Sequence, residues 1–495
     1  MSASRSLRLG DGTSDSGAPR DHRRRERDRA SSERLVTDIL VGTVLFVVAF
    51  YLRVRVASEL AGEPVWDGHY YDFGARRIAE GFGYSDDIVV GGGAKVWHPW
   101  CHYPVGYSAF LGIFYRLFGA HAETAHAANA AVGAALALVT FLLARELLSP
   151  IRSYVAGALV ALHPGLVLYS ALVMSEPLSA LLAITAFYVA VRVARSERAV
   201  GKEWLGPVAG ALVLGLAALV RPQALLCAPF LALTTNGRWW PRLRVAVIAS
   251  VVSVLPVLPW TARNCAVMDG CALVSTNAGW NLAIGSFPRA TGRFETLRSS
   301  DGCREVTGQV QQDRCWLEYG LAHIAAEPGR WLALVPKKLS YTFDHESFAV
   351  DYLREARPGA WPDAKAHAWR TGLGNVHRAL LAAAAFAFVA GAGVRDERGR
   401  LVQATVRALV AVGVLLAFLS DDQTWWPLVV VGCALPLLPL PGQPRHHAAL
   451  GLPVVLIATT ALAHAVFFGE NRYHVAITPA LCLLAAAAFR SPEDA

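Results

Sequence analysis

A carboxylate follows the first long apolar run of the chain. The run covers residues 35–56, arginines precede it, and Asp67 lies in the stretch 65–84 just after it. About 20 apolar residues are enough to cross a bilayer as a helix, and basic flanks favour the cytoplasmic side. We therefore expect Asp67 to emerge just outside the far membrane face, where a carboxylate can act as a general base. The alternative is an ordinary solvated acid in a loop.

Further ionisable residues fall at the predicted ends of apolar runs, on the same side as Asp67. Ionisable groups at a membrane edge are costly and are therefore candidates for function. An acid there can take a proton from an acceptor hydroxyl, while Arg and Lys hold a phosphate leaving group. Each residue also has a structural interpretation, such as helix capping for Glu176 or snorkelling for the lysines. The candidates are His102, Glu176, Arg221, Arg263, Lys337, Lys338, Arg472, Tyr473 and His474.

Two short helices are predicted in the loop that carries Asp67. Residues 71–82 place Tyr71 and Ala75 on an apolar face and Arg76 on a polar face, which is typical of a helix lying on a membrane surface. Residues 107–118 are apolar but short, and counting them as a span would invert the sidedness of the following basic loops. We interpret them as a surface-lying or re-entrant helix.

The composition indicates an all-α polytopic membrane protein. Of the 495 residues, 54% are apolar and 17% are charged, and apolar runs recur along almost the whole chain. The net charge of +8 comes largely from Lys and Arg in short segments between apolar runs, which is topology information. Nucleic acid is therefore not an expected partner.

Alternation of apolar runs and basic loops predicts about twelve transmembrane helices, with both termini in the cytoplasm. The predicted spans are 35–56, 124–147, 154–172, 177–193, 205–220, 224–235, 245–260, 373–394, 401–419, 427–440, 450–468 and 475–489. This topology divides the chain into four regions. They are a disordered basic cytoplasmic tail (1–34), a transmembrane core (35–260) with a first outer loop (57–123), an exported loop region (261–372), and C-terminal transmembrane helices (373–495).

Four of the eight cysteines fall in the exported region, as two close pairs. Paired cysteines outside the cytoplasm indicate disulfides. The most economical connectivity joins Cys265 to Cys271 and Cys303 to Cys315, and other connectivities stay open. Metal binding is less favoured, because neither spacing is that of a CxxC knuckle.

A series of short motifs resembles the GT-C integral-membrane glycosyltransferases, of the protein O-mannosyltransferase and lipid A aminoarabinose or galacturonosyl transferase type (glycosyltransferase family 39-like). No single motif is specific, but their number and order are. The motifs are Asp67 with Tyr70 and Tyr71, then 81–84 (GFGY), 102–107 (HYPVGY), 169–177 (YSALVMSEP), 220–222 (VRP), 259–264 (PWTARN), 275–277 (STN) and 472–474 (RYH).

This resemblance implies a GT-C fold and an inverting transferase that uses a polyprenyl-phosphate sugar, with Asp67 as base and Glu176 as a second acid. It implies that Tyr70, Tyr71 and the candidates above contact the donor phosphate or the substrate. Many relatives have a second acid directly after the first, and here that position is Gly68. This departure leaves a divalent metal open, and no cofactor is certain. The acceptor, which is a protein, a lipid or a glycan, is also left open.

The resemblance places the protein in a bacterial inner (plasma) membrane among membrane lipids, with its active site facing the periplasm or exterior. The main alternative is a multi-pass transporter or flippase of lipid-linked glycans. Such transporters usually have internal repeats and broken helices with polar residues at mid-membrane, whereas the acids here lie at predicted helix ends. A non-catalytic subunit that binds lipid is a further alternative, and two carboxylates near one interface argue against it.

Overall fold

The computed structural model describes most of the chain, which falls into two compact units, Met1–Val44 and Leu45–Ala495. Each unit is considered by itself. Three predicted helices, 373–394, 427–440 and 475–489, run past the described residues at their C-terminal ends. The described residues are 18–89, 95–196, 202–235, 239–387, 397–420, 424–434 and 448–488.

In the first unit, the described residues belong to helix α1 (Ala18–Leu60). The helix begins within the segment 1–34, which was predicted to be disordered, and residues 1–17 lie outside the described part of the chain. Residues 18–34 contain many arginines together with Glu and Ala, all of which have high helix propensity. Because extending an existing helix costs little per residue, these polar residues continue the helix of the apolar run.

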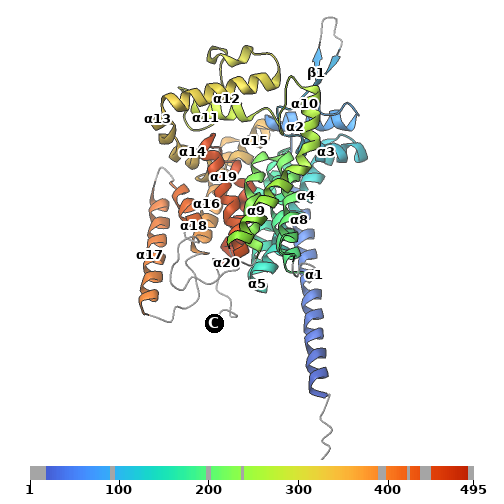
Figure 1. Ribbon diagram of the computed structural model, residues 1–495, viewed down its shortest axis with the longest axis vertical. Helices are drawn as coiled ribbons and strands as arrows, with labels where there is room; N and C mark the ends of the chain where they lie inside the picture. The colour runs from blue at the N-terminus through green and yellow to red at the C-terminus, as the bar shows by residue number, and fades with distance from the viewer. Residues whose placement is uncertain are drawn as a thin grey trace, which may run out of the picture. The chain divides into compact units, whose positions relative to one another are not determined.

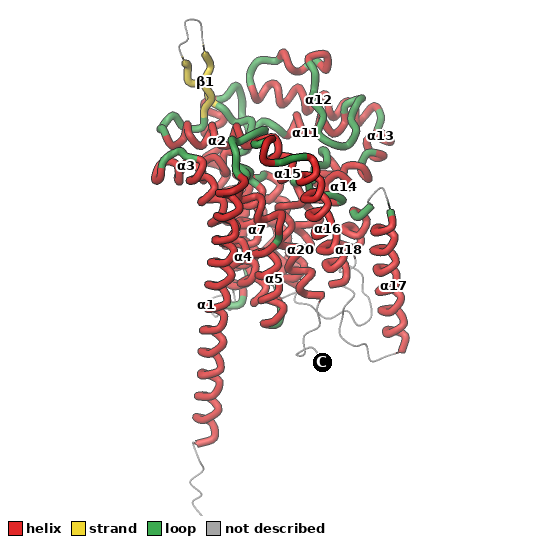
Figure 2. The backbone as a smooth tube through the Cα atoms, turned by 180° about the vertical axis from the view of Figure 1, so that it is seen from behind, coloured by secondary structure: helices red, strands yellow, loops and turns green. Residues whose placement is uncertain are grey.

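Helices make up most of the described secondary structure (Figures 1 and 2). After α1, the elements in chain order are α2 (Asp67–Ala79), β1 (Ser85–Val89), β2 (Lys95–Pro99), α3 (Val105–Phe118), α4 (Ala122–Leu147), α5 (Pro150–Leu162), α6 (Pro164–Leu168), η1 (Tyr169–Ala171), α7 (Glu176–Ala194), α8 (Leu205–Val220), η3 (Pro222–Thr234), α9 (Trp239–Val254), η4 (Leu255–Val257), α10 (Leu258–Val267), α11 (Ala278–Ser286), η5 (Ser299–Asp301), η6 (Cys303–Glu305), α12 (Gln309–Ala326), α13 (Pro328–Ala333), α14 (Val335–Phe343), α15 (Phe348–Ala356), η7 (Pro358–Ala360), α16 (Asp363–Ala387), α17 (Glu397–Leu419), α18 (Trp426–Ala434), η9 (Ala448–Leu450), α19 (Gly451–Val466), η10 (Tyr473–Ile477) and α20 (Thr478–Ala488).

Six stretches of helix in the described residues are long and apolar enough to cross a membrane, or seven if one bent pair counts as a single span. The protein is therefore an integral membrane protein with a mostly helical fold. Every predicted apolar run falls on at least one helix, but several of these helices are shorter than a span. The total of about twelve stays a prediction. The six are Ser32–Leu60, Ala122–Leu147, Glu176–Ala194, Trp239–Val267, Glu397–Leu419 and Ala448–Val466.

The bent pair replaces the single helix predicted over 154–172. The chain bends by 47° between Pro150–Leu162 and Pro164–Ala171. Pro164 explains the break, because proline lacks an N–H for the preceding turn and restricts the residue before it. His163, at the break, has a non-helical φ of −60° and ψ of 118°. The break therefore leaves a buried histidine between two helical segments.

Small residues let α7 and α8 approach closely. A Cβ placed on Gly206 would lie 2.4 Å from the carbonyl oxygen of Ala190, and one on Gly210 would lie 2.8 Å from that of Ala186. Close approach of backbones through small residues is the usual way for helices to associate in lipid, where apolar burial supplies little driving force between helices. This packing holds the N-terminus of α7 near the C-terminus of α8, where two candidate site residues lie.

Helices α2, α3, α11, α12 and α13 gather at one end of the long helices in the second unit (Figures 1 and 2). The two short helices predicted around Asp67 are present as α2 and α3, and they pack against each other. An antiparallel hairpin between them, with Ser85 opposite Pro99, was not predicted. Disulfides join Cys265 to Cys271 and Cys303 to Cys315 in this region, with the connectivity expected from their spacing.

Candidate active site

Asp67 is the first residue of α2, and both of its carboxylate oxygens have partners. The hydroxyl of Tyr103 donates to Oδ1 at 2.7 Å, and the guanidinium of Arg472 pairs with Oδ2. The Asp67 side chain keeps 21% of its surface exposed. A carboxylate in the first turn of a helix is also stabilised by the free N–H groups and the helix dipole. The structure thus holds an accessible, oriented carboxylate at this helix end.

The turn that presents Asp67 is braced by α15. Trp66 has a φ of +51°, the left-handed region that large residues rarely adopt. Its ring packs on Phe348 and Tyr352 of α15, with centroids 5.5 and 5.9 Å away. The backbone N–H of Val65 donates to the Tyr352 hydroxyl at 3.2 Å. These contacts stabilise an otherwise unfavourable backbone conformation and fix the direction in which α2 starts.

Gly68 explains why the second acid expected from the resemblance is missing. A Cβ at this position would lie 2.2 Å from the Tyr352 hydroxyl and 2.9 Å from the carbonyl oxygen of Val173. Contacts below 3.0 Å force something to move, and the Val173 atom belongs to the backbone. No larger side chain fits at position 68 without such a shift.

Arg472 is held from several sides. Its Nε lies 2.5 Å from Oε2 of Glu470, and its guanidinium carbon lies 5.2 Å from the ring centre of Phe348 and 5.1 Å from that of Tyr473. Planar guanidinium groups stack on aromatic faces and pair with carboxylates at fixed angles. The cation opposite Asp67 is therefore oriented by groups other than Asp67 itself.

The surroundings favour the ionised form of Asp67 over that of Glu470. Burial raises the pKa of Asp67, but the charge of Arg472 and the hydrogen bonds from Tyr103 and Arg472 bring the pKa below its ordinary value. Burial raises the pKa of Glu470, and the attraction of Arg472 does not fully offset it. Asp67 is therefore more readily deprotonated than Glu470.

A second ion pair lies beside the first. Glu176 at the start of α7 is fully buried and pairs with Arg221, which follows α8 and is 12% exposed. The guanidinium carbon of Arg221 lies 5.5 Å from the ring centre of Tyr473, so both arginines contact the same ring. The hydroxyl of Tyr71 lies 3.3 Å from that of Ser175, next to Glu176. Two acids and two guanidinium groups thus meet around Tyr473.

Aromatic residues line the side of α2 near Asp67. Tyr70 is 47% exposed and stacks on Trp100 and Tyr103, with ring centres 5.8 and 5.6 Å apart. The rings of His102 and Tyr103 pack edge to face, with their centres 5.1 Å apart. Burial lowers the pKa of His102. These contacts explain the orientation of the Tyr103 hydroxyl, which reaches Asp67.

Four predicted donor-binding residues have other contacts. Arg263 donates to the carbonyl oxygens of Tyr84 and Trp100 at 2.7 and 3.1 Å, and so fastens the base of the hairpin. Lys338 donates to the carbonyl oxygens of two residues at the end of α19, at 3.1 and 3.4 Å. Burial and the charge of Arg330 lower the pKa of Lys338 to about 8. His474 faces a different buried cluster, and Lys337 is exposed beside Gly292.

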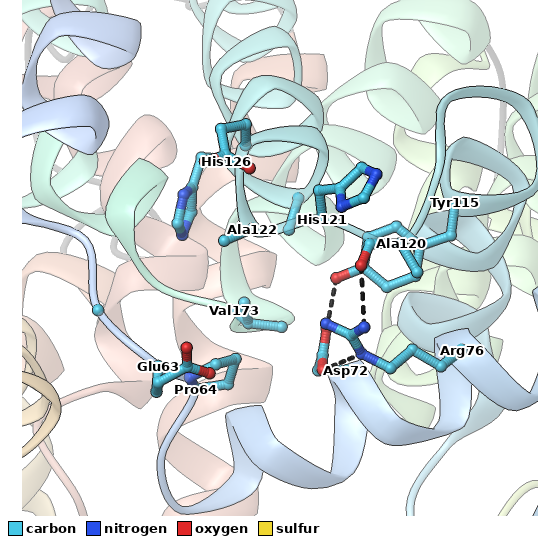
Figure 3. Close-up of a pocket in the computed structure, with 13 residues that line it drawn as sticks. Glu63, Pro64, Asp72, Arg76, Tyr115, Ala120, His121, Ala122, His126 and Val173 are labelled. Carbon is cyan, nitrogen blue, oxygen red and sulfur yellow. Dashed lines mark hydrogen bonds and ion pairs between the residues drawn. The ribbon is translucent and has the colours of Figure 1, made fainter.

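Asp72 belongs to a separate cavity on another side of α2 (Figure 3). Its carboxylate accepts from Nε of Arg76 at 2.7 Å and from the Tyr115 hydroxyl. The cavity has a volume of about 220 Å³, and its lining includes Glu63 and His126 but neither Asp67 nor Arg472. Asp72 therefore does not supply the acid that Gly68 lacks.

Sequence reasoning missed Glu470 and Phe348 as members of the site, and it noted Tyr103 only as part of a motif, without a role. Tyr103 stands between two residues of the HYP motif, which was a detectable signal, and Glu470 lies two positions before Arg472. Phe348 carried no signal, because an apolar residue in an apolar chain does not reveal that a guanidinium stacks on it.

The apolar spans and the two acid–guanidinium pairs define an integral membrane protein with a charged site at the ends of its helices. Residues 102–262 match the family model described as dolichyl-phosphate-mannose-protein mannosyltransferase. This match agrees with the predicted resemblance to GT-C glycosyltransferases over the matched residues. The matched segment includes Glu176 and Arg221 but not Asp67 or Arg472. No curated protein sequence matches the chain.

Several solved structures resemble this chain at low sequence identity. The Archaeoglobus fulgidus oligosaccharyltransferase in complex with Zn and sulfate is 14% identical, over 90% of this chain and 48% of its own, with a TM-score of 0.43. AglB from the same organism, in complex with an inhibitory peptide and a dolichol-phosphate, is 14% identical over 90% and 50%, with a TM-score of 0.37. ArnT from Cupriavidus metallidurans bound to undecaprenyl phosphate is 14% identical over 92% and 78%, with a TM-score of 0.34. The chain spans about half the length of the archaeal structures.

Proposed function

We propose that the protein transfers a sugar from a polyprenyl-phosphate-linked donor to an acceptor on the non-cytoplasmic face of the membrane, with inversion at the anomeric carbon. The observation that carries this proposal is the Asp67 carboxylate, which is accessible, ionised and positioned by Tyr103 and Arg472 beside a second arginine, Arg221. The description of the matched family names a dolichyl-phosphate-linked sugar as the donor, which agrees with this chemistry.

In the proposed reaction, Asp67 accepts the proton of an acceptor hydroxyl while the hydroxyl oxygen attacks the anomeric carbon. The bond from that carbon to the phosphate oxygen breaks, and polyprenyl phosphate leaves with the bonding electron pair. Arg472 and Arg221 are placed to neutralise the charge that develops on the phosphate. Because Arg472 also lowers the pKa of Asp67, a phosphate that draws Arg472 away makes Asp67 a stronger base.

Glu176 has a supporting role in this proposal. Its buried carboxylate pairs with Arg221 and keeps that guanidinium against the Tyr473 ring. Glu176 thus positions a phosphate-binding group and does not take the acceptor proton. The hydroxyl of Tyr71 reaches the neighbouring Ser175, which links α2 to the start of α7.

The sidedness and domain organisation form part of the same proposal. Asp67 lies in the outer loop 57–123 that follows the first span, and the region 261–372 carries both disulfides. Disulfides form and persist outside the reducing cytoplasm. We therefore place the site on the periplasmic or exterior face of a bacterial plasma membrane.

A transfer assay in sealed membrane vesicles tests the proposed function. We expect labelled sugar to move from a polyprenyl-phosphate donor to protein, lipid or glycan acceptors, offered in parallel. In right-side-out vesicles, whose non-cytoplasmic leaflet faces the medium, an acceptor that cannot cross the membrane should be glycosylated when added outside. Inside-out vesicles should not glycosylate it. Movement of the intact donor across the bilayer without bond cleavage would instead establish the flippase alternative. If the vesicles show neither transfer nor movement, the remaining alternative is a non-catalytic subunit that binds lipid.

The pH dependence of transfer should reveal the coupling between Arg472 and Asp67. Arg472 holds the pKa of Asp67 below its ordinary value, so removing the cation raises that pKa. A general base is active only above its pKa, and the acid limb of kcat/KM in Arg472→Gln should therefore shift to higher pH. Arg263→Gln is the control, because Arg263 contacts backbone carbonyls away from Asp67. If the acid limb of Arg472→Gln lies at the same pH as that of wild type, the limb does not report the protonation of Asp67.

A further inference from the structure

Four buried polar side chains converge in the second unit, away from the Asp67 carboxylate. Oε2 of Glu346 lies 4.0 Å from Nε2 of His163, 3.9 Å from Nδ1 of His377 and 3.8 Å from Nε2 of His474. All four side chains are at least nine-tenths buried. They come from the break between α5 and α6, the loop before α15, helix α16 and the segment η10.

Backbone contacts fix which nitrogens carry protons. Nε2 of His377 lies 2.8 Å from the carbonyl oxygen of Phe343, and Nδ1 of His474 lies 2.7 Å from that of Thr342. A carbonyl only accepts, so each of these nitrogens bears the hydrogen. The opposite nitrogen of each neutral ring therefore has a lone pair, and in both rings that nitrogen faces Glu346.

The atoms that face the centre of this cluster have no hydrogen-bond partner among the described residues. These atoms are Oε2 of Glu346, Nε2 of His163, Nδ1 of His377 and Nε2 of His474. Leaving a buried polar atom unpaired costs about 1–3 kcal/mol, and more if it is charged. Nδ1 of His163 accepts from the N–H of Leu166, so its Nε2 bears the hydrogen. The lone pairs of His377 and His474 and the carboxylate oxygen of Glu346 face one another and repel, so a positive group is needed between these three.

Direct protonation does not satisfy the cluster in this geometry. The separations of 3.8–4.0 Å exceed the range of a hydrogen bond. The rings of His377 and His474 stack with centres 4.0 Å apart, which two imidazolium cations would not do. A tetrahedral zinc ion with bonds of about 2.0–2.2 Å brings its ligand atoms to about 3.3–3.6 Å from one another. Closing the gaps between Glu346 and the two histidines by a few tenths of an ångström meets that requirement for these pairs.

We propose that Glu346, His377 and His474 bind a divalent first-row transition metal ion, with Zn²⁺ as the probe. The three ligand atoms lie within 4.8 Å of one another. Imidazole and carboxylate ligands suit Zn²⁺, and metal-binding histidines usually donate their other N–H to a backbone carbonyl, as both do here. Gly165 leaves room for the carboxylate, because a Cβ there would lie 1.5 Å from Oε1 of Glu346.

The site would join segments that are far apart in the sequence. Glu346 lies just before α15, which braces the turn of Asp67, and His474 is two residues after Arg472. The metal ion would therefore fix the segment that supports the Asp67 turn relative to the segment that carries Arg472. This proposal concerns binding alone and stands or falls separately from sugar transfer.

Metal analysis of the full-length protein tests the proposal. Because the ligands are buried, the ion must enter as the chain folds, so protein should be purified without chelators from cells grown with added Zn²⁺. We expect about one zinc per wild-type chain by mass spectrometry, and a fall to background in Glu346→Gln and His377→Ala. Wild-type protein containing no more zinc than these variants would overturn the proposal.

His464→Gln is the matched control. His464 is similarly buried, stacks on Tyr473 at 4.0 Å and contacts the carbonyl oxygen of Phe468, but it is not in the cluster. This variant should keep its zinc, and an equal loss would mean that any buried histidine has this effect. If the ligand variants do not fold, the absorption spectrum of wild-type protein substituted with Co²⁺ identifies the ligands instead. Absorption without thiolate charge-transfer bands supports the site, and thiolate bands would assign the metal to cysteines.

Discussion

Asp67→Asn should lower the rate of sugar transfer by about 10²- to 10⁴-fold, the usual contribution of a positioned general base. Asparagine keeps the size of the side chain and can still accept from Tyr103, but its amide cannot take up a proton. Binding of the polyprenyl-phosphate donor should survive, because the proposed phosphate contacts are Arg472 and Arg221. The measurement is transfer by purified variant and wild type at equal donor occupancy.

Asp72→Asn is the control on the same helix. Asp72 pairs with Arg76 and lines the separate cavity (Figure 3), so its loss should leave the base in place. Near-normal transfer by Asp67→Asn would remove the base assignment. Equal losses in the two variants would point to damage to α2 as a whole.

Arg221→Met should destabilise the protein by about 3–5 kcal/mol, because it leaves the buried carboxylate of Glu176 without its counter-charge. Replacing both residues, as Glu176→Met with Arg221→Met, should recover part of this loss, since no uncompensated charge remains. The free energy of unfolding of the four proteins in detergent, compared as a double-mutant cycle, measures the coupling.

The pair between Arg354 and Asp363, outside the membrane spans, is the exposed control. Its side chains are 42% and 87% exposed, so Arg354→Met should change stability little. An Arg221→Met protein as stable as wild type would show that Glu176 is not charged or not enclosed.

The sequence predicted the helical elements well because apolar runs of membrane length are strong signals. Each run falls on a helix, and the short helix 107–118 was recognised from the sidedness of the following loops. Breaks within runs were harder to predict. Pro164 interrupts one predicted span and Pro229 lies within the 3-10 segment η3, and whether proline bends or ends a helix depends on what packs around it. The strands 85–89 and 95–99 had no alternating apolar pattern that would predict them.

For the site, residue types could be predicted but pairings could not. Asp67, Glu176, Arg221 and Arg472 were all candidates, and the structure gathers them around Tyr473. The sequence did not distinguish these arginines from Arg263, whose partners are backbone carbonyls. Carbonyl acceptors carry no sequence signature, because every residue has one.

Gly68 restricts the order in which substitutions could accumulate at this site. Any lineage acquiring a carboxylate at position 68 would first have to shorten or move Tyr352, whose hydroxyl occupies the space of a Cβ. Losing that hydroxyl removes its bond to the N–H of Val65 and loosens the support of the Trp66 turn. The intermediate would have an unsupported Asp67 before any second acid could compensate. A change from one acid to two therefore requires a matching change at Tyr352, and relatives with either arrangement should keep residues 68 and 352 matched.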